Sequence, residues 1–565
     1  MEQSRETSDT FQIKTDEMAT CVQGLDNLIR AEYNTSHNFL DYYAGKDNLS
    51  SVYNVRNQIF YGRRGTGKTH LLKALQEKVL LDEEKNFFSI YIDLRHLKPL
   101  MGEENPLYYA LILFREICIE MFKCAYVNVP LIFKINEFDS NNRLQIAAKR
   151  DQVQGYLTRL NASLEHKHIE SIDNLQFNIK EIRALEASLN ISMNPEISAK
   201  AENSESKDST HRKITYLSFA DMTQVLSHFL DNIGVNNIFL LIDEWSEIPI
   251  KVQPYLSELL KRSLIPSKIV LKIAAIPNRT KLMQNKFGLE DGGDIFGYKL
   301  DNRYIYELET DTTKRFFNEL LYNQLTLIDK NIFASINGSF HPGSTILNQF
   351  LATQALREIL VGSAGIPRDF LSIFINSFKH YYNRTNSAAH ITLEDVRAAT
   401  IEWYELDKKR AVEANESARI MLDMIIKEVI IEKKRCHFIL PERFETHEIL
   451  NDLIDLRVIH FRKRGISHKD IKGVSYNVYY IDYACYTSSN IYHNKINNKL
   501  LEELKDVDNF RDIRRISLEE KFFDNLNTEL GYGFKCPHCG DVVDTRHPAY
   551  TKQSLCNRCF EKVVP

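Results

Sequence analysis

Residues 62–69 read Gly62-Arg63-Arg64-Gly65-Thr66-Gly67-Lys68-Thr69, and this stretch decides the fold class. It follows the short apolar run 58–61, and it precedes residues 71–75, whose composition favours a helix. A glycine-rich loop between a strand and a helix can curl so that its N–H groups point inward at phosphate oxygens. The pattern G-x-x-x-x-G-K-[ST] in this context predicts a phosphate-binding loop in an α/β protein.

The residue types in the loop predict ATP and Mg²⁺ as ligands. Lys68 is expected to reach the β and γ phosphates, and the Thr69 hydroxyl is expected to ligate Mg²⁺. The helix that starts here adds the positive end of its dipole. The predicted nucleotide-binding set is Gly62, Arg63, Arg64, Gly65, Thr66, Gly67, Lys68, Thr69, His70 and Asp243.

The second half of the predicted site lies far downstream, after the apolar run 238–242. Such a run is typical of a strand buried on both faces. Asp243 follows it and is expected to hold Mg²⁺, as a Walker B aspartate does. Glu244 is then placed to polarise a water for attack on the γ-phosphate, with Glu247 as a weaker rival.

Length and composition set broad limits. At 565 residues the chain is long enough for several domains, and the net charge of −4 gives no global basic field. The N-terminus is polar, and no run approaches the apolar length of a membrane-spanning helix. We therefore expect a cytoplasmic protein that has no membrane partner.

Four of the nine cysteines form a separate set near the C-terminus: Cys536, Cys539, Cys556 and Cys559. Their C-x2-C, sixteen residues, C-x2-C spacing predicts a structural Zn²⁺ site of the ribbon or knuckle type within residues 530–562. A disulfide pair is the alternative, and it is disfavoured in a reducing compartment. His538 can replace one thiolate, but we expect it to point outward.

The order of motifs along the chain suggests six parts. Residues 1–44 are a polar, mildly helical segment, and a nucleotide-binding core is expected over 45–130 and 215–310. The helical insertion 131–214 interrupts that core. The sequence of this insertion is polar. It either contacts a partner or is a solvent-exposed extension without a binding role, and we favour the second interpretation.

Two further site residues are predicted after strands of the core. Asn278 follows the apolar run 269–276 and is expected to touch the γ-phosphate or the attacking water. Residues 303–308 are expected to form a further strand, and Arg303 before it is a possible arginine finger for a neighbouring subunit. A surface salt bridge is the alternative role for Arg303.

The remaining sequence predicts a helical lid over 311–410 and a winged helix over 415–495. In the lid, Pro367 presets the first turn of a helix, and Arg368 projects from its N-terminus. In the winged helix, residues 462–469 are expected to form the basic tip of a hairpin. This tip supplies the DNA-contact candidates Arg462, Lys463, Arg464 and Lys469, although the same tip can be a solvated loop on a protein-binding module.

These motifs together resemble the AAA+ family, and within it the clade of origin-recognition and cell-division-cycle ATPases. The resemblance rests on residues 62–69, on Asp243-Glu244-Trp245-Ser246, on the strand that ends near Asn278, on Gly365-Ile366-Pro367-Arg368 and on the winged helix. It covers roughly 45–130 and 215–490. It implies a five-stranded parallel sheet, a lid arginine (Arg368) on the γ-phosphate, and oligomers that share nucleotide sites.

Three functions are compatible with the sequence. The first is a Mg-ATP switch that hydrolyses ATP and thereby controls DNA association and oligomer state. The second is a signalling or antiphage-defence ATPase of the STAND type, which shares the Gly-x-Pro motif and whose winged helix and zinc module bind a protein effector such as a nuclease. The long insertion and the terminal cysteine motif are not standard for replication initiators. The third is a remodelling motor, which is disfavoured because the sequence shows no aromatic-glycine pore loop.

Overall fold

The computed structural model describes residues 12–32, 38–97, 105–164, 168–169, 216–217, 219–333, 346–385, 388–433, 435–468, 471–487 and 516–563. Most of the insertion predicted over 131–214 lies outside these residues. Lys469 lies outside them as well. Within the described part of the chain, no helix is long and apolar enough to cross a membrane.

A five-stranded sheet forms the centre of the nucleotide-binding domain, and its strand order is β2-β5-β6-β1-β9. Every neighbouring pair of strands runs parallel. The fold class expected from the sequence is therefore confirmed. The strands are β1 (Gln58–Tyr61), β2 (Phe87–Asp93), β5 (Asn237–Asp243), β6 (Ile269–Ala275) and β9 (Phe296–Lys299).

The strand predicted over 303–308 is wrong, because the fifth strand is β9, several residues earlier. β9 is a short edge strand with mostly exposed residues, so it carries no apolar run that a sequence pattern can detect. The apolar residues Ile305 and Tyr306 are buried in a turn, and Tyr306 packs into the core of the lid.

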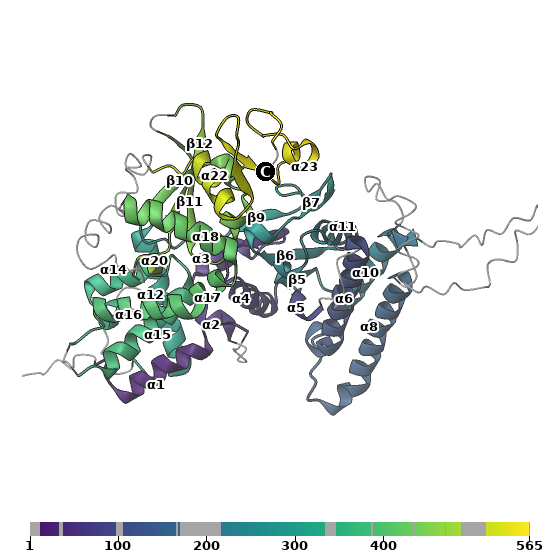
Figure 1. Cartoon of the computed structure of the whole chain (residues 1–565). Coiled ribbons are helices and arrows are strands. Elements are labelled where there is room, and N and C mark those ends of the chain that lie inside the picture. Colours follow the sequence, from purple (N-terminus) through teal and green to yellow (C-terminus); the bar gives the residue numbers. More distant parts are fainter. Residues whose placement is uncertain are drawn as a thin grey trace, which may run out of the picture.

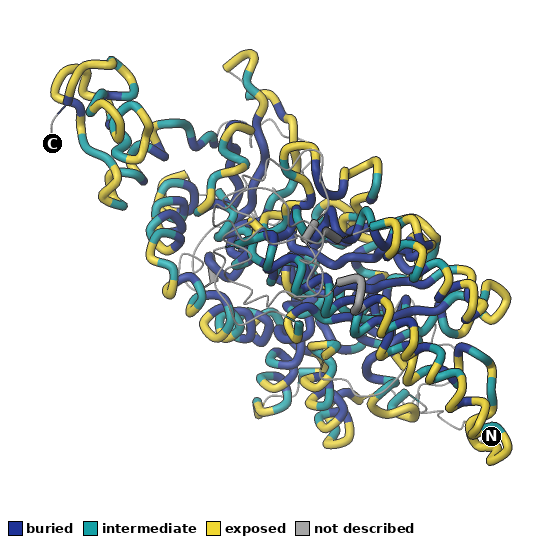
Figure 2. The backbone as a smooth tube through the Cα atoms, turned by 90° about the vertical axis from the view of Figure 1, so that its right-hand side faces the viewer, coloured by how far each residue is buried: buried dark blue, intermediate teal, exposed yellow. Residues whose placement is uncertain are grey.

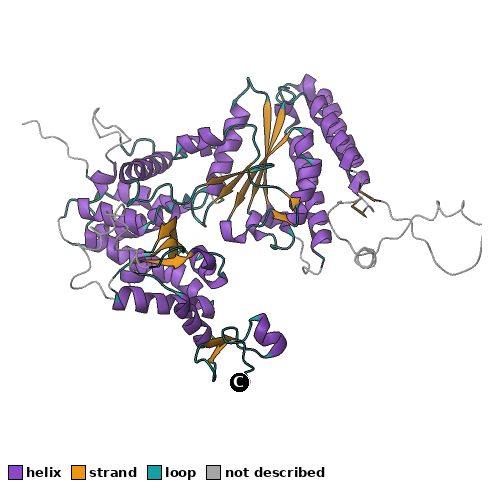
Figure 3. Cartoon of the chain, turned by 90° about the horizontal axis from the view of Figure 1, so that it is seen from above, coloured by secondary structure: helices purple, strands orange, loops and turns teal. Residues whose placement is uncertain are grey.

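Successive residues of the strands enter two different cores, as expected for a sheet covered on both faces. Ile238, Leu240 and Ile242 pack with the helices of one face, whereas Phe239 and Leu241 pack with those of the other. Figure 3 shows helices on both sides of the sheet. The first group is α6 (Pro106–Val127), α10 (Phe219–Ile233) and α11 (Gln253–Ser263), and the second is α2 (Phe39–Tyr42), α3 (Lys46–Val52) and α4 (Lys68–Leu81).

Further elements lie around this sheet and its helices. Helix α8 (Arg143–Leu164) packs on α6 and α10 and forms the outer edge of the molecule on the right of Figure 1. The remaining elements are α5 (Leu94–Leu97), α7 (Val129–Ile132), β3 (His168–Ile169), β4 (Tyr216–Leu217), β7 (Met283–Gln284) and β8 (Phe287–Gly288).

The lid is helical, and the N-terminal helix α1 (Asp16–Gly24) is part of it. Met18 and Val22 of α1 are buried in the lid core. The polar sequence of residues 1–44 did not predict this burial. The other lid helices are α12 (Thr310–Ile328), α13 (Ile346–Phe350), α14 (Thr353–Gly362), α15 (Pro367–Asn383) and α16 (Leu393–Trp403). A π-helix, η7 (Tyr404–Lys409), and α17 (Arg410–Glu413) lead into the next domain.

The winged helix comprises α18 (Glu416–Ile425), the π-helix η8 (Ile426–Glu432), β10 (His437–Pro441), α19 (Glu448–Asp455), β11 (Ile459–Ser467) and β12 (Ser475–Ile481), followed by α20 (Tyr483–Thr487). Its three strands form an antiparallel sheet in the order β10-β12-β11. The hairpin is longer than expected, because β11 continues through Ser467 with two register irregularities. Its residues share one continuous hydrophobic core with the lid helices.

A small C-terminal module follows, and Figure 2 shows it at one end of the molecule with many exposed residues. It contains β13 (Gly533–Lys535), β14 (Val542–Asp544) and α23 (Pro548–Gln553), preceded by α22 (Glu520–Glu529). Phe522, Phe523 and Leu526 of α22 are buried in the core of the lid and winged helix. The module itself has only a minimal core, formed by Cys536, Val543, Cys556 and Val563.

Candidate nucleotide site and zinc centre

The glycine-rich loop connects β1 to α4, at the carboxyl end of the central strand. Gly65 and Gly67 have φ angles of +83° and +86°, which L-residues with side chains rarely adopt. At Gly62, an added Cβ would lie 2.4 Å from the Thr66 Oγ1. The loop conformation therefore depends on glycine at these three positions, as the phosphate-binding pattern predicts.

Lys68, the first residue of α4, is held by the loop itself. Its Nζ donates hydrogen bonds to the carbonyl oxygens of Gly62, at 2.7 Å, and of Arg63, at 3.0 Å. Burial lowers the pKa of the ammonium, while the carboxylates of Asp243 and Asp301 act in the opposite direction. The lysine thus presents a poorly solvated cation inside the loop, which favours binding of an anionic phosphate.

Asp243 lies at the tip of β5 and faces the start of α4. Its carboxylate accepts hydrogen bonds from the Tyr91 hydroxyl at 2.8 Å, from the Glu244 N–H at 2.8 Å and from the Thr69 side chain. Burial raises the pKa of Asp243, and these hydrogen bonds oppose the rise. A carboxylate beside a threonine hydroxyl is a donor set of hard oxygens, which suits Mg²⁺.

Glu244 has a left-handed backbone with φ of +57°, an unusual conformation for a residue with a long side chain. It lines the cavity beside the loop. Burial, and then the adjacent Asp243, raise the pKa of its carboxyl group, which suits a general base. Its rival Glu247 is instead 3.5 Å from the Arg64 guanidinium and does not line the cavity.

The cavity is formed by several parts of the chain, including the tip of β5 at Glu244. The loop and α4 contribute Arg64 to His70, the lid contributes Pro367, Arg368 and Leu371, and the N-terminal segment contributes Leu28 to Glu32. The N-terminal contribution was not predicted, because no local pattern shows where a short segment after a helix will lie. His70 is enclosed by the rings of Phe39, Tyr42 and Tyr43, and burial lowers its pKa to about 4.

Arg368, in the first turn of α15, lies directly against the phosphate-binding loop. The backbone N–H of Arg368 donates a hydrogen bond to the Gly65 carbonyl at 3.3 Å, and a Cβ on Gly65 would lie 2.9 Å from the Arg368 Cβ. Burial lowers the pKa of the guanidinium, with a further contribution from Arg457. The structure therefore brings Arg368 into the lining of the same cavity as Lys68 and Glu244.

Other predicted ligands lie outside the cavity. The buried Arg63 guanidinium contacts Asp301 at 3.1 Å and also His460 of the winged helix, so only its carbonyl faces Lys68. Asn278 is exposed on the turn after β6, and it does not line the cavity. Its neighbour Arg279 contacts Asp455 at 2.6 Å.

Arg303 lies beside the cavity without entering it. Its guanidinium stacks 4.5 Å from the centre of the Tyr298 ring and donates a hydrogen bond to Asn48. It lines a second, open hollow together with Lys46, Glu309 and Arg315. Its role as a finger toward a neighbouring subunit stays a prediction.

The predicted basic tip of the winged helix is only partly present. The expectation that Arg462 projects from the tip is wrong, because β11 is longer and irregular there. Its guanidinium lies over the Tyr480 ring, near Asn302 at 3.5 Å and Glu307. Lys463 and Arg464 are exposed, and Arg464 forms an ion pair with Glu445.

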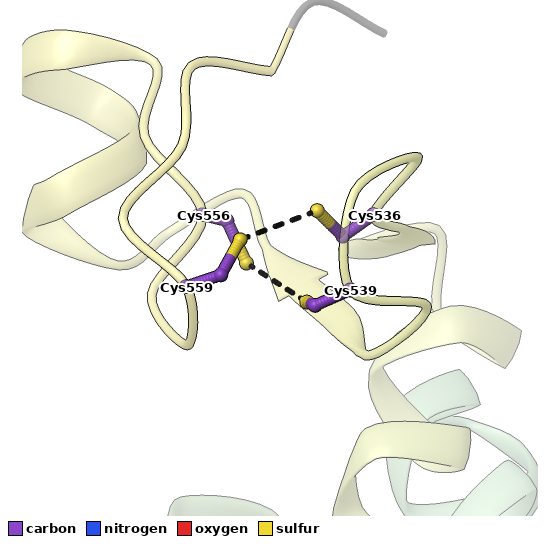
Figure 4. Close-up of side chains that lie close together, drawn as sticks. All are labelled: Cys536, Cys539, Cys556 and Cys559. Atoms are coloured by element: carbon purple, nitrogen blue, oxygen red, sulfur yellow. Dashed lines mark hydrogen bonds between the residues drawn. The ribbon is translucent and has the colours of Figure 1, made fainter.

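Four thiols gather in the C-terminal module, as Figure 4 shows. The Sγ atoms lie within 4.8 Å of one another, with Cys536 and Cys559 3.7 Å apart and Cys539 and Cys556 3.8 Å apart. A tetrahedral site with Zn–S bonds of about 2.3 Å has S–S edges of about 3.8 Å. The thiol positions therefore fit a four-thiolate zinc site, and His538 is turned away, toward the Lys562 carbonyl at 3.2 Å.

The two cysteine turns have matching backbones. The N–H of His538 donates to the Cys536 Sγ, and the N–H of Arg558 donates to the Cys556 Sγ, both at 3.4 Å. Each turn ends in a left-handed residue, Gly540 in one case and Phe560 in the other. Such N–H donors stabilise thiolates, so the backbone of both turns is compatible with a metal site.

The phosphate-binding loop, the acidic strand tip and the lid arginine surround one cavity on a parallel sheet, and they define a P-loop protein of the AAA+ class. A family model described as ORC-CDC6-like matches residues 27–349. The chain belongs to the ORC-CDC6-like family, the origin-recognition-like AAA+ ATPases.

Two solved structures are similar to this chain at low identity. One is the ORC1 protein of Aeropyrum pernix in complex with DNA, at 13% identity and a TM-score of 0.29, covering 83% of this chain and 98% of that one. The other is Drosophila ORC bound to DNA, at 11% identity and a TM-score of 0.30, covering 87% and 95%. No curated protein matches the chain.

Proposed function

We propose that this protein is a Mg-ATP-dependent switch that binds and hydrolyses ATP and thereby controls its association with DNA and with further subunits. The observation that carries the proposal is that Lys68, Glu244 and Arg368 line one cavity, and that the buried Asp243 carboxylate accepts a hydrogen bond from Thr69, which also lines it. These residues come from three separate parts of the fold, and each has the chemistry that triphosphate hydrolysis requires.

Each residue has a distinct task in this proposal. Lys68 exchanges its hydrogen bonds to the loop carbonyls for phosphate oxygens, and the loop N–H groups orient the phosphates. Thr69 and Asp243 hold Mg²⁺, which neutralises charge on the phosphates when bound. Glu244 accepts a proton from the attacking water, and Arg368 stabilises the negative charge that develops on the γ-phosphate.

The cysteine module is proposed to hold one structural Zn²⁺. Four thiolates fill every coordination position of a tetrahedral ion, so the metal supplies folding energy to the module. The module is joined to the lid and winged helix through α22, whose Glu520 is 2.7 Å from Arg558 of the second cysteine turn. It therefore moves with the winged helix.

DNA contact is proposed for the hairpin of the winged helix, with Lys463, Arg464 and Lys472 as the exposed cations. Helix α19 is a poor candidate for the major groove, because it carries Glu448, Asp452 and Asp455 and has no lysine or arginine. Carboxylates that face a phosphate-lined groove are repelled, whereas a basic hairpin can follow the backbone.

The test is a measurement of DNA affinity with and without ATP and Mg²⁺ over a series of salt concentrations. We expect ATP to change the DNA affinity at least tenfold. We expect the Lys463→Ala and Lys472→Ala double variant to reduce the slope of log affinity against log salt concentration by about two. The matched control is Lys281→Ala together with Lys286→Ala, a pair of lysines near the β7–β8 turn. Equal affinity in both nucleotide states would refute the switch.

A protein-signalling role is the second candidate, and the inward position of Arg462 and the acidic α19 favour it. In this role the winged helix and the zinc module bind a protein effector, and DNA contact is incidental. The same experiment separates the two roles: no DNA affinity at physiological salt, with ATP binding intact, favours the signalling role.

A further inference from the structure

A chain of buried charged and polar side chains connects the winged helix to both sides of the nucleotide cavity. Its members come from the phosphate-binding loop, the lid, the π-helix η7 and the winged helix, and nearly all are at most 6% exposed. They are Arg63, Asp369, Asp407, Lys408, Arg457, His460 and Asp482, and Asp407 at 25% is the most exposed. Burying this many polar groups is costly, so the arrangement calls for a reason beyond stability.

One branch of the chain ends at the phosphate-binding loop. His460, on β11, has its Nε2 2.8 Å from the Asp482 carboxylate and its Nδ1 in contact with the Arg63 guanidinium. The carbonyl of the same Arg63 accepts a hydrogen bond from Lys68. A single residue therefore separates the winged-helix histidine from the lysine of the nucleotide site.

The other branch ends at the lid arginine. Asp369 follows Arg368 in the first turn of α15, and its carboxylate contacts Lys408 at 3.2 Å and Arg457 of the winged helix. Arg457 has a left-handed backbone, with φ of +62°, and its guanidinium also pairs with Asp407. Lys408 closes the chain, because its Nζ is 2.8 Å from Asp482.

Packing explains why these links matter. The lid and the winged helix share one hydrophobic core, whereas the sheet has two cores of its own. In the described residues, the winged helix and the sheet domain are joined by polar links such as Arg63 to His460, Arg279 to Asp455 at 2.6 Å, and Asn302 to the Phe461 carbonyl at 3.1 Å. Polar links of this kind can break and re-form without exposing an apolar core.

We propose that Arg457 and His460 of the winged helix are positioning residues of the nucleotide site. Arg457 fixes Asp369 and thereby Arg368, and His460 fixes Arg63 and thereby the loop that holds Lys68. Nucleotide binding and the position of the winged helix are consequently linked, and each biases the other by the same factor. This inference rests on the proposed ATP site, and it names Arg457 and His460 as the residues through which that site and the winged helix affect each other.

The test compares His460→Leu, which breaks both contacts, with His460→Gln, which can keep them, because an amide donates and accepts at similar reach. The matched control is His437→Leu. His437 is an equally buried histidine of the same sheet, and it contacts Tyr480 and the Cys436 thiol inside the winged helix. ATP affinity is measured by calorimetry with Mg²⁺ present, and DNA affinity is measured with and without ATP.

We expect His460→Leu to weaken ATP binding about tenfold and to reduce the effect of ATP on DNA affinity to less than twofold. We expect His460→Gln and His437→Leu to stay within twofold of the wild-type chain in both measurements. A folded His460→Leu variant with wild-type ATP affinity and wild-type coupling overturns the inference. Wild-type protein that binds no ATP overturns the proposed function instead, so the two failures are distinct.

A second measurement on the unchanged chain covers the case in which His460→Leu does not fold. Amide hydrogen exchange is followed with and without Mg-ATP in three segments: the loop 62–69, the first turn of α15 and strand β11. We expect ATP to change the exchange of all three segments. Protection of the loop and the lid with no change in β11 overturns the link to the winged helix.

Discussion

The C-terminal module should lose its structure when its metal is removed. Its core consists of two valines beside two of the cysteines. Burying two valine side chains contributes about 4 kcal/mol, which does not offset the entropy of ordering about 30 residues. A structural zinc ion contributes about 10–16 kcal/mol in small metal-dependent domains, so the metal decides whether the module folds.

The assay is zinc release to a chromogenic chelator, combined with amide hydrogen exchange before and after metal removal. We expect one zinc per chain, and loss of protection over 533–563 when the metal is removed. Helix α22 should stay protected, because Phe522 and Phe523 are anchored in the core of the lid and winged helix.

Two variants sharpen this prediction. Cys539→Ser should release the zinc, whereas His538→Ala should retain it, because His538 contacts the Lys562 carbonyl and is turned away from the thiols. Metal-free protein with a fully protected module would refute the reasoning, as would equal zinc loss in the two variants.

Three further predictions follow from single positions. Glu244→Gln should bind ATP with near-wild-type affinity and lose turnover at least 100-fold, because the amide cannot accept a proton; wild-type turnover would move the base to another residue. Gly65→Ala should weaken ATP binding about tenfold or more, since a Cβ there meets Arg368 at 2.9 Å with φ at +83°; wild-type affinity in calorimetry would contradict the loop geometry. Burial lowers the pKa of Lys272 to about 7, below its unfolded value of 10.5. The unfolded chain therefore binds more protons between these values, and stability should rise by about 1 kcal/mol per pH unit over that window. Urea titrations of Lys272→Met should lack this rise, and an identical slope in both proteins would contradict the assignment.

Local patterns predicted the parts of the molecule that are continuous in sequence. The loop 62–69, the strand that ends at Asp243 and the first turn of α15 each carry their own signal of glycine, apolar run or proline. Parallel strands place their carboxyl ends at one edge of a sheet, so these signals also predicted that Lys68 and Asp243 lie together.

Side-chain direction was not accessible to the same reasoning. Arg462 belongs to a basic run that resembles an exposed hairpin tip, yet the irregular register of β11 turns it toward Asn302 and the Tyr480 ring. β9 was not predicted from the sequence, because an exposed edge strand of four residues has no apolar pattern. Both errors arose where tertiary packing decides the outcome.

The buried polar contacts between domains also could not be predicted from the sequence. Arg63 and His460 are separated by 397 positions in the sequence, and each has an ordinary local explanation. Arg63 is one of the variable positions of a phosphate-binding loop, and His460 lies between the apolar residues Ile459 and Phe461 at the start of a strand. Their contact follows only from the way the lid and winged helix pack beside the sheet.

The most direct test of the whole account is calorimetric titration of ATP with Mg²⁺ into the intact chain and into Lys68→Ala. We expect one ATP per wild-type chain and a loss of affinity of about 100-fold in the variant, the equivalent of a charged hydrogen bond of about 3 kcal/mol. Absence of heat with the wild-type chain, or equal affinity in the two proteins, would contradict it.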